Sequence, residues 1–414
     1  MLTPTPARPP IFALTEQQHD MLALAGQLAT QFAERADEHD RNGTFPFENY
    51  TALHAAGYLR LPVPREYGGM GASLLDVVLA QERLAQGDGA TALAVAMTMQ
   101  VLGRLSETRQ WPAALFERVC RTVVQEGALI NAAATEPDMG SPSHGGLPAT
   151  LATPATHGDV AGWSITGHKQ FITMAPVLRY FVVIVRLPAS PTMPYGGSAN
   201  AIIERRPNQD VAGLQLVDTW SGNLGLRASG SYDVYLDQVF VPDALLVDRK
   251  PATPPDQPVP ASKAVSNTAW FALTLAAVYL GIGQAACDTV CHYAQQRIPS
   301  ALGKPIATLP NIQRRIGAIQ IELDAARALL YQTAQAWGDA PPQRGQMLPR
   351  IAAAKYTATN AAVAATDQAL RVAGGFGLQR VLPLERYFRD VRAGVTHPPN
   401  DDAALELVGR SVLG

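Results

Sequence analysis

The sequence is poor in cysteine: its 414 residues include only Cys120, Cys287 and Cys291. Three cysteines are too few for a disulfide framework and suit a reducing compartment, so we expect a cytoplasmic protein. Cys287 and Cys291 lie four residues apart, which would place them on one face of a helix, but no second pair of ligands completes a metal motif. Packing is therefore the better interpretation, and we expect no metal site.

The chain also has little net charge, with a formal value of −2 at pH 7. It therefore lacks the electrostatic attraction that draws proteins to nucleic acid or to anionic membranes. The uncharged run from Thr268 to Cys287 is nearly long enough to span a bilayer, but it contains two glycines and no basic flank, which favours a buried helix. The opening residues MLTPTPARPP have no apolar core of signal-peptide length. We predict a small-molecule partner, with neither nucleic acid nor a membrane involved.

Helical patterns fill the first third of the chain. Thr15-Glu-Gln-Gln18 forms a capping-box pattern and is followed by apolar residues at helical spacing, which predicts a helix from about Thr15 to Glu38. Further Ala/Leu-rich segments at 74–86, 89–105 and 113–125 are separated by turn residues. Residues 1–127 are therefore expected to form an N-terminal helical domain.

The pattern changes after residue 127. Short β-prone runs separated by Gly, Pro, Asn and Asp predict a central antiparallel β-barrel or sandwich domain over residues 128–249. The runs are Ala128–Thr135, Trp163–Thr166, Lys169–Thr173, Tyr180–Leu187, Ala201–Glu204, Leu214–Trp220 and Ser231–Val241. A Pro-rich linker, Lys250–Ala261, then opens a C-terminal domain, 250–414, in which helical periodicity returns. The predicted fold class is α+β and multidomain, with a four-helix bundle at the C-terminus.

Two motifs lie in the first half of the chain. Val63-Pro-Arg-Glu-Tyr-Gly-Gly-Met-Gly71 is weak alone, because Pro and Gly form turns in many proteins. Thr135-Glu-Pro-Asp-Met-Gly-Ser141 follows the first β-run. A strand end rich in N–H and O–H groups can stabilise negative charge on a bound ring. The plain alternative is an ordinary loop that begins at a Glu-Pro dipeptide.

Two further motifs follow. In Ile165-Thr-Gly-His-Lys-Gln-Phe-Ile-Thr173, an aromatic residue and a hydroxyl lie two positions apart, so on a regular strand both would face one ligand. A hairpin with a core Phe is the alternative. Ala373-Gly-Gly-Phe-Gly377 precedes Pro383-Leu-Glu-Arg-Tyr-Phe-Arg-Asp390. Glycines of this kind let the backbone approach a pyrophosphate closely.

In this order and over nearly the whole chain, the four motifs resemble the acyl-CoA dehydrogenase family. The resemblance implies an FAD-dependent oxidoreductase, with FMN the less favoured flavin, that acts on an acyl thioester. It also implies a homotetramer or homodimer whose subunits share the flavin. The implied cofactor contacts are Ala134, Thr135, Ser141, Phe171, Thr173, Arg297, Leu302, Gln313, Arg371, Gly374, Gly375 and Asn400.

The chain departs from the family at the catalytic base. Family members remove an α-proton with a Glu that follows the Arg-Asp pair, and counting from Arg389-Asp390 places Pro398 at this position. In other members the Glu lies on an earlier helix, where Phe271 stands here. We therefore take His397 as the candidate catalytic residue, because imidazole titrates near neutrality. A rigid turn around His397 is the alternative.

Two carboxylates, Asp401 and Asp402, are other possible proton acceptors, although capping of the last helix is their better interpretation. Three functions stay open. The first is oxidation of the CH–CH bond of an acyl thioester with a non-standard base. The second is a flavin-dependent monooxygenase or oxidase, which needs no carboxylate. The stretch Leu226–Val234 resembles the corresponding strand of that branch of the family. The third is a non-catalytic flavoprotein.

Overall fold

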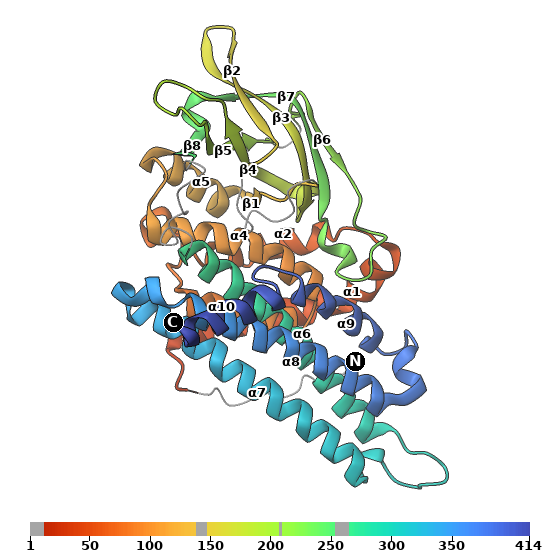
Figure 1. The fold of residues 1–414 in the computed structure, drawn as a ribbon. Coiled ribbons are helices and arrows are strands. Elements are labelled where there is room, and N and C mark those ends of the chain that lie inside the picture. Colours follow the sequence, from red (N-terminus) through yellow and green to blue (C-terminus); the bar gives the residue numbers. More distant parts are fainter. Residues whose placement is uncertain (1–11, 138–146, 207–208, 253–264) are drawn as a thin grey trace.

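The computed structural model describes residues 12–137, 147–206, 209–252 and 265–414. Helices come first, strands occupy the middle of the chain, and helices return to the end. In Figure 1 the strands gather at one end of the molecule, and the N-terminal helices lie between them and the C-terminal helices. The predicted fold class is confirmed.

The N-terminal helices begin and end where local chemistry allows. The Thr15 side chain accepts from the backbone N–H of Gln18, and the Gln18 side chain accepts from the N–H of Thr15, so the predicted capping box is present. The first helix continues past the expected end at Glu38 and stops at Gly43, which takes a left-handed conformation with φ of 62°. The helices are α1 (Glu16–Asn42), α2 (Phe47–Ala55), α3 (Leu74–Ala85), α4 (Gly89–Thr108) and α5 (Ala113–Glu126).

The strands form a mixed sheet in the order β6-β7-β3-β2-β4-β5-β8, with β1 beside β4. Most neighbours are antiparallel, as predicted, but β1 and β2 pair with β4 in parallel, because β1 enters the sheet from α5 in the same direction as β4. The strands are β1 (Leu129–Ala133), β2 (Leu151–His157), β3 (Val160–Ile172), β4 (Leu178–Leu187), β5 (Gly197–Glu204), β6 (Leu214–Val217), β7 (Tyr232–Pro242) and β8 (Leu246–Pro251).

Three strand predictions need correction. The runs 163–166 and 169–173 belong to the single strand β3, which contains a register shift between Lys169 and Ile172. The strand β2 was missed because its sequence, LATPATH, contains a proline and it is mostly exposed, so that no apolar run marks it. The strand β8 extends into the start of the predicted linker. Edge and exposed strands lack the alternation that sequence patterns detect.

The C-terminal helices surround α6. This helix is long and apolar enough to cross a bilayer, but 94% of its apolar window is buried within the protein, as expected for a core helix. It packs against α8, α3 and α4, and its Trp270 covers Gly103 of α4 so closely that a Cβ at that glycine would clash with the ring. The helices are α6 (Val265–Gln296), α7 (Pro310–Asp339), α8 (Leu348–Ala373), α9 (Leu384–Asp390) and α10 (Asp401–Leu413).

Candidate functional site

A cluster of hydroxyl groups lies at the end of β3. The Thr173 hydroxyl is 3.0 Å from the Ser231 hydroxyl, which is 2.8 Å from the Ser229 hydroxyl. Asn131 on β1 donates its side-chain N–H to the Thr173 carbonyl at 3.0 Å. All four residues are buried. The predicted residue Thr173 is therefore held in a defined position by β1 and by the segment before β7.

Phe171 adopts a strained backbone conformation. Its φ of 59° lies in the left-handed region that bulky side chains avoid. Its ring is 52% exposed and meets the edge of Trp220 at a centroid distance of 5.7 Å. Because this conformation interrupts the strand, the expectation that Phe171 and Thr173 share one face of a regular strand is wrong. The strained conformation instead presents the Phe171 side chain at the surface, beside the partly buried Trp220.

A buried ion pair anchors the chain just after Thr135. The Lys169 ammonium is 2.6 Å from a Glu136 carboxylate oxygen. The same carboxylate accepts hydrogen bonds from the Ala149 and Thr150 backbone N–H groups and from the Thr150 hydroxyl. Burial raises the pKa of Glu136, but these hydrogen bonds outweigh burial and bring it to about 2. The carboxylate therefore joins both ends of the segment that begins at Thr135.

Two residues of this motif had a predicted role in flavin binding. The Thr135 carbonyl accepts from the Gln170 N–H at 3.0 Å. The Thr135 side chain takes no part in this bond and is partly exposed. Ala134 beside it is also partly exposed. Ser141 lies outside the described residues. The structural role of Glu136 and Lys169 was missed, although a lone Lys in a β-run was the available signal.

An open glycine turn ends α8. A Cβ added at Gly374 or Gly375 would meet no atom within 4 Å, so the backbone here is accessible. The Arg297 guanidinium lies 4.8 Å from the centroid of the exposed Phe376 ring. Arg371 is exposed and pairs with Asp367 at 2.7 Å. The glycines and two arginines therefore form one accessible, cationic region.

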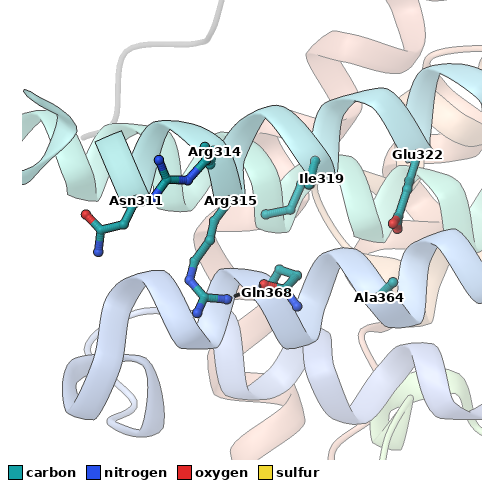
Figure 2. A pocket seen from close by; sticks show the side chains of 8 residues that line it. Asn311, Arg314, Arg315, Ile319, Glu322, Ala364 and Gln368 are labelled. Atoms are coloured by element: carbon teal, nitrogen blue, oxygen red, sulfur yellow. Dashed lines mark hydrogen bonds between the residues drawn. The ribbon is translucent and has the colours of Figure 1, made fainter. Parts of the chain in front are cut away.

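The other predicted contacts of this region lie on the loop before α7 and at its start. Leu302 is partly exposed. Gln313 is exposed and donates to the Ala307 carbonyl at 3.0 Å. A groove of about 360 Å³ lies between α7 and α8 and is lined by Asn311, Arg314, Arg315, Ala318, Ile319, Glu322, Ala364 and Gln368. Figure 2 shows these side chains on the two helices. Gln313 lies on α7 beside this groove, and most of the groove's lining residues are polar.

His397 lies where a 3-10 helix, Val391–Val395, ends. Its Nδ1 is 2.8 Å from the hydroxyl of Tyr279, a fully buried residue of α6. The Phe271 ring meets its imidazole edge-on at a centroid distance of 6.4 Å. Both positions that could supply a Glu base, Pro398 and Phe271, are therefore close to His397 and carry no proton acceptor. Asn400, and not an aspartate, caps α10 by accepting from the Ala403 N–H.

Burial and a nearby cation keep His397 uncharged. Burial, with a smaller contribution from Lys355, lowers the pKa of His397 to about 4. Burial and Asp390 raise the pKa of Tyr279 well above its usual range, so the phenol keeps its proton. The buried phenol satisfies this proton by donating to Nδ1, which leaves the imidazole proton on Nε2. His397 thus offers an N–H donor and is a weak base at neutral pH.

A second buried lysine lies in this region. Lys355 of α8 is fully buried, and its ammonium is 3.8 Å from an Asp401 carboxylate oxygen. The other Asp401 oxygen accepts from Asn360 at 3.0 Å. Burial lowers the pKa of Lys355 to about 8, although Asp401 opposes this shift. Lys355 and Tyr279 were missed, and an isolated lysine in an alanine-rich helix was the only signal for the former.

These residues fit a flavin. The exposed Phe171 beside the partly buried Trp220 suits a planar apolar ring, the hydroxyl cluster suits its polar edge, and open glycine backbone beside arginine suits phosphate. The hydroxyl cluster and Phe171 belong to the strand domain, whereas the glycines end α8.

Three family models match the chain in order. They are described as acyl-CoA dehydrogenase N-terminal domain (residues 15–107), middle domain (131–239) and C-terminal domain (273–401). "Putative acyl-CoA dehydrogenase YdbM" of Bacillus subtilis is 36% identical and covers 95% of this chain and 97% of its own length.

Two relatives of another kind also match. The amino sugar nitrososynthase RubN8 of Streptomyces rubradiris is 30% identical over 94% of this chain and 89% of its own length. The solved structure of KijD3, in complex with FMN and a dTDP-linked amino sugar, has a TM-score of 0.82 and 26% identity, and covers 98% of this chain and 95% of that one. Both sets of relatives indicate a flavin-dependent oxidoreductase.

Proposed function

Because the chain belongs to the acyl-CoA dehydrogenase family and is a flavin-dependent oxidoreductase, we propose that it is a monooxygenase that oxidises a small molecule with dioxygen. The observation that carries this proposal is the environment of His397. Both family positions for a carboxylate base hold residues that accept no proton, Pro398 and Phe271. The remaining candidate is an uncharged imidazole bonded to Tyr279.

An uncharged His397 suits oxygen chemistry better than proton abstraction. Its Nδ1 lone pair accepts from Tyr279 and its Nε2 carries the proton, so no free lone pair is left to remove a carbon-bound proton. A fixed N–H donor in a partly buried position stabilises negative charge that develops on an oxygen atom. His397 would therefore orient and stabilise an anionic oxygen by donating from Nε2. The amino sugar nitrososynthase and KijD3 similarities support a nitrogen-containing substrate.

A bound flavin would supply the redox chemistry, since its ring accepts a hydride and passes electrons to dioxygen. In this proposal Ala134, Thr135 and Thr173 contact the polar edge of the ring, and Phe171 covers its face. The Arg297 and Arg371 guanidinium groups with the backbone of Gly374 and Gly375 suit a diphosphate, which favours FAD over FMN.

A neighbouring copy of the chain would complete the flavin site. Three apolar side chains near the glycine turn are exposed: Phe376 (41%), Leu378 (74%) and Val381 (72%). This apolar surface supports a homotetramer or homodimer. Leu302, Gln313 and Asn400 would contact the flavin in such an assembly.

Oxidation of an acyl thioester is the second candidate. The 36% identity to the Bacillus protein favours it. In this case His397, Asp401 or Asp402 must accept the α-proton.

One experiment separates these functions. The purified protein is analysed for its flavin by chromatography and is mixed anaerobically with a panel of acyl-CoA thioesters. Under the proposal the oxidised flavin band persists with every thioester, and the flavin reduced by a separate reductase consumes dioxygen and oxygenates a nucleotide-linked amino sugar. Bleaching by a thioester at a catalytic rate would overturn the proposal in favour of the second candidate.

A matched pair of variants tests the histidine. His397→Ala should reduce oxygenation about 100-fold, the usual effect of losing one donor to an anionic oxygen. Thr396→Ala, at the exposed neighbouring residue, should leave turnover unchanged. Equal turnover of the His397 variant and the unaltered protein would remove His397 from the mechanism.

A further inference from the structure

The end of α9 is fastened to the strand domain. Asp390 is 2% exposed, and its carboxylate accepts from the Leu226 backbone N–H at 2.6 Å. The Arg389 guanidinium donates to the Leu224 carbonyl at 2.9 Å. A Cβ added at Gly225 would lie only 2.5 Å from the Arg389 carbonyl oxygen, so the two backbones are in close contact. Three successive residues of the segment before β7 are therefore held by the last two residues of α9.

Leu226 has a backbone conformation that needs such contacts. Its φ of 53° lies in the left-handed region, which residues with large apolar side chains rarely adopt. A conformation of this kind persists only where the surrounding structure holds it. The Leu226 carbonyl accepts from the Trp220 indole N–H and from the Ser229 backbone N–H, each at 3.0 Å. These two partners belong to the strand domain, and Asp390 supplies the contact to the Leu226 N–H from the helical bundle.

Leu226 joins two parts of the proposed flavin site. On its N-terminal side, Trp220 bonds to its carbonyl and meets the edge of the Phe171 ring. On its C-terminal side, Ser229 and Ser231 supply two members of the hydroxyl cluster. A change in the conformation of Leu226 would therefore displace both the aromatic rings and the hydroxyl groups.

Ion pairing within α9 does not account for Asp390. The two arginines of this helix have carboxylate partners on α1, because Arg386 lies 2.8 Å from Asp37 and Arg389 lies 2.5 Å from Asp40. Burial of a carboxyl group is costly unless hydrogen bonds replace those that it makes to water. The replacement here comes from the backbone of the strand domain. The Asp390 side chain therefore serves the contact between the two domains.

We propose that Asp390 is a positioning residue for the flavin: its carboxylate holds Leu226, and through Leu226 it fixes the aromatic rings and the hydroxyl cluster in the arrangement that receives the ring. Asp390 also leads directly into the 3-10 helix Val391–Val395 that precedes His397. One residue thus sets the flavin edge relative to the proposed N–H donor. The inference deepens the proposed function and rests on its placement of the flavin, but not on the reaction.

The hydrogen bond is tested first, on the whole chain with and without flavin. Hydrogen–deuterium exchange with mass spectrometry follows the peptide that contains residues 221–231. Asp390→Ala should speed exchange in this peptide about tenfold, because the Leu226 N–H loses its acceptor. Asp390→Asn retains an acceptor oxygen and should restore slow exchange. The control Asp237→Ala, at an exposed aspartate, should have no effect. Unchanged exchange in Asp390→Ala, or equally fast exchange in Asp390→Asn, would overturn the inference.

Flavin binding then shows whether the contact matters for the cofactor. Asp390→Ala should weaken the affinity for FAD, measured by titration, about 10- to 100-fold, and Asp390→Asn should recover most of it. The flavin that Asp390→Ala binds should have a more negative reduction potential, because loosely held hydroxyls stabilise the charge of the reduced ring less well. A lower melting temperature with unchanged affinity and potential would overturn the inference. If Asp390→Ala does not fold, Asp390→Glu, whose carboxylate is displaced by one methylene, replaces it with the same expected directions.

A variant in the hydroxyl cluster separates this inference from the proposed site. Thr173→Val removes one hydroxyl with little change in volume and should by itself weaken flavin binding and make the reduction potential more negative. If it changes neither quantity, the proposed placement of the flavin fails and the inference falls with it. If Thr173→Val changes both and Asp390→Ala changes neither, the site stands and the inference alone falls. Neither outcome depends on whether the flavin oxidises a thioester or reacts with dioxygen.

Discussion

The two buried lysines of this chain have opposite surroundings. Lys169 in the strand domain bonds to Glu136 at 2.6 Å and also donates to the Ile184 carbonyl at 2.7 Å. Lys355 in the helical bundle lies 3.8 Å from Asp401, and its ammonium has no hydrogen-bond partner among the described residues. Burial lowers the pKa of both lysines. The first is a completed polar network and the second is an incomplete one.

The difference indicates where each lysine contributes. A buried charge with all its hydrogen bonds fixes one conformation, and here it joins the two ends of a segment of the candidate flavin site. A buried charge without hydrogen bonds costs stability, so that its presence requires another explanation. In the bundle Lys355 is such a charge, because it faces Asp401 at 3.8 Å without a hydrogen bond. The following experiments test the comparison from the largest expected effect to the smallest.

Lys169→Met should be the most damaging change, lowering the free energy of unfolding by about 3–5 kcal/mol, because it leaves the buried Glu136 without its cation. Urea denaturation measures the loss, with Lys250→Met at an exposed position as the control. The dependence of the unfolding free energy on pH should also change at acid pH. Since the folded pKa of Glu136 is about 2, its contribution is present above pH 4.5 and is lost as the pH falls toward 2. If Lys169→Met lowers the free energy of unfolding by less than 1 kcal/mol, the two lysines do not differ in their contribution to stability.

His397→Gln should alter the pH dependence of stability. The folded pKa of His397, about 4, is below the unfolded value near 6.5, so the unfolded state binds more protons between these values. Stability should fall as the pH drops through this window, by at most about 3 kcal/mol, and the variant should lose this slope. Denaturation curves at several pH values would show it. Parallel slopes for both proteins would mean that His397 titrates normally.

Asp401→Asn should cost about 1–2 kcal/mol, less than a completed buried pair, because Asp401 is 28% exposed and water already screens it. The pKa of Lys355 should fall further below about 8, since its counterion is lost. The loss should therefore be smaller at pH 9 than at pH 6. A loss that is independent of pH would assign the effect to the bond between Asp401 and Asn360.

Lys355→Met should change the free energy of unfolding by less than about 1 kcal/mol or increase it, because an apolar side chain of similar length removes an uncompensated charge. Thermal denaturation of this variant beside Lys169→Met gives the comparison directly. The stable variant expected in the bundle contrasts with the unstable one expected in the sheet. A loss of 3 kcal/mol or more in both would remove the distinction.

The sequence predicted the fold better than the site. The capping box at Thr15 and the uncharged run of α6 are local or compositional signals, and the structure bears them out. The regular-strand argument for Phe171 failed because a register shift near Ile172 interrupts β3, and alternation does not encode such a shift. The capping role expected for the aspartates belongs to Asn400. Tyr279 carried no pattern that singled it out, and the motif around Glu136 did not reveal that its carboxylate pairs with Lys169.

The sequence by itself determined the order of helices and strands and the absence of a carboxylate at Pro398 and Phe271, because periodicity, capping and residue identity are local properties. Only the tertiary structure decided that the Tyr279 hydroxyl meets His397 across 118 residues. It also decided that Lys355 is buried beside Asp401. Contacts of this kind depend on how several helices pack. Packing is set by side-chain shape and burial across the whole core, and no short segment of sequence contains this information.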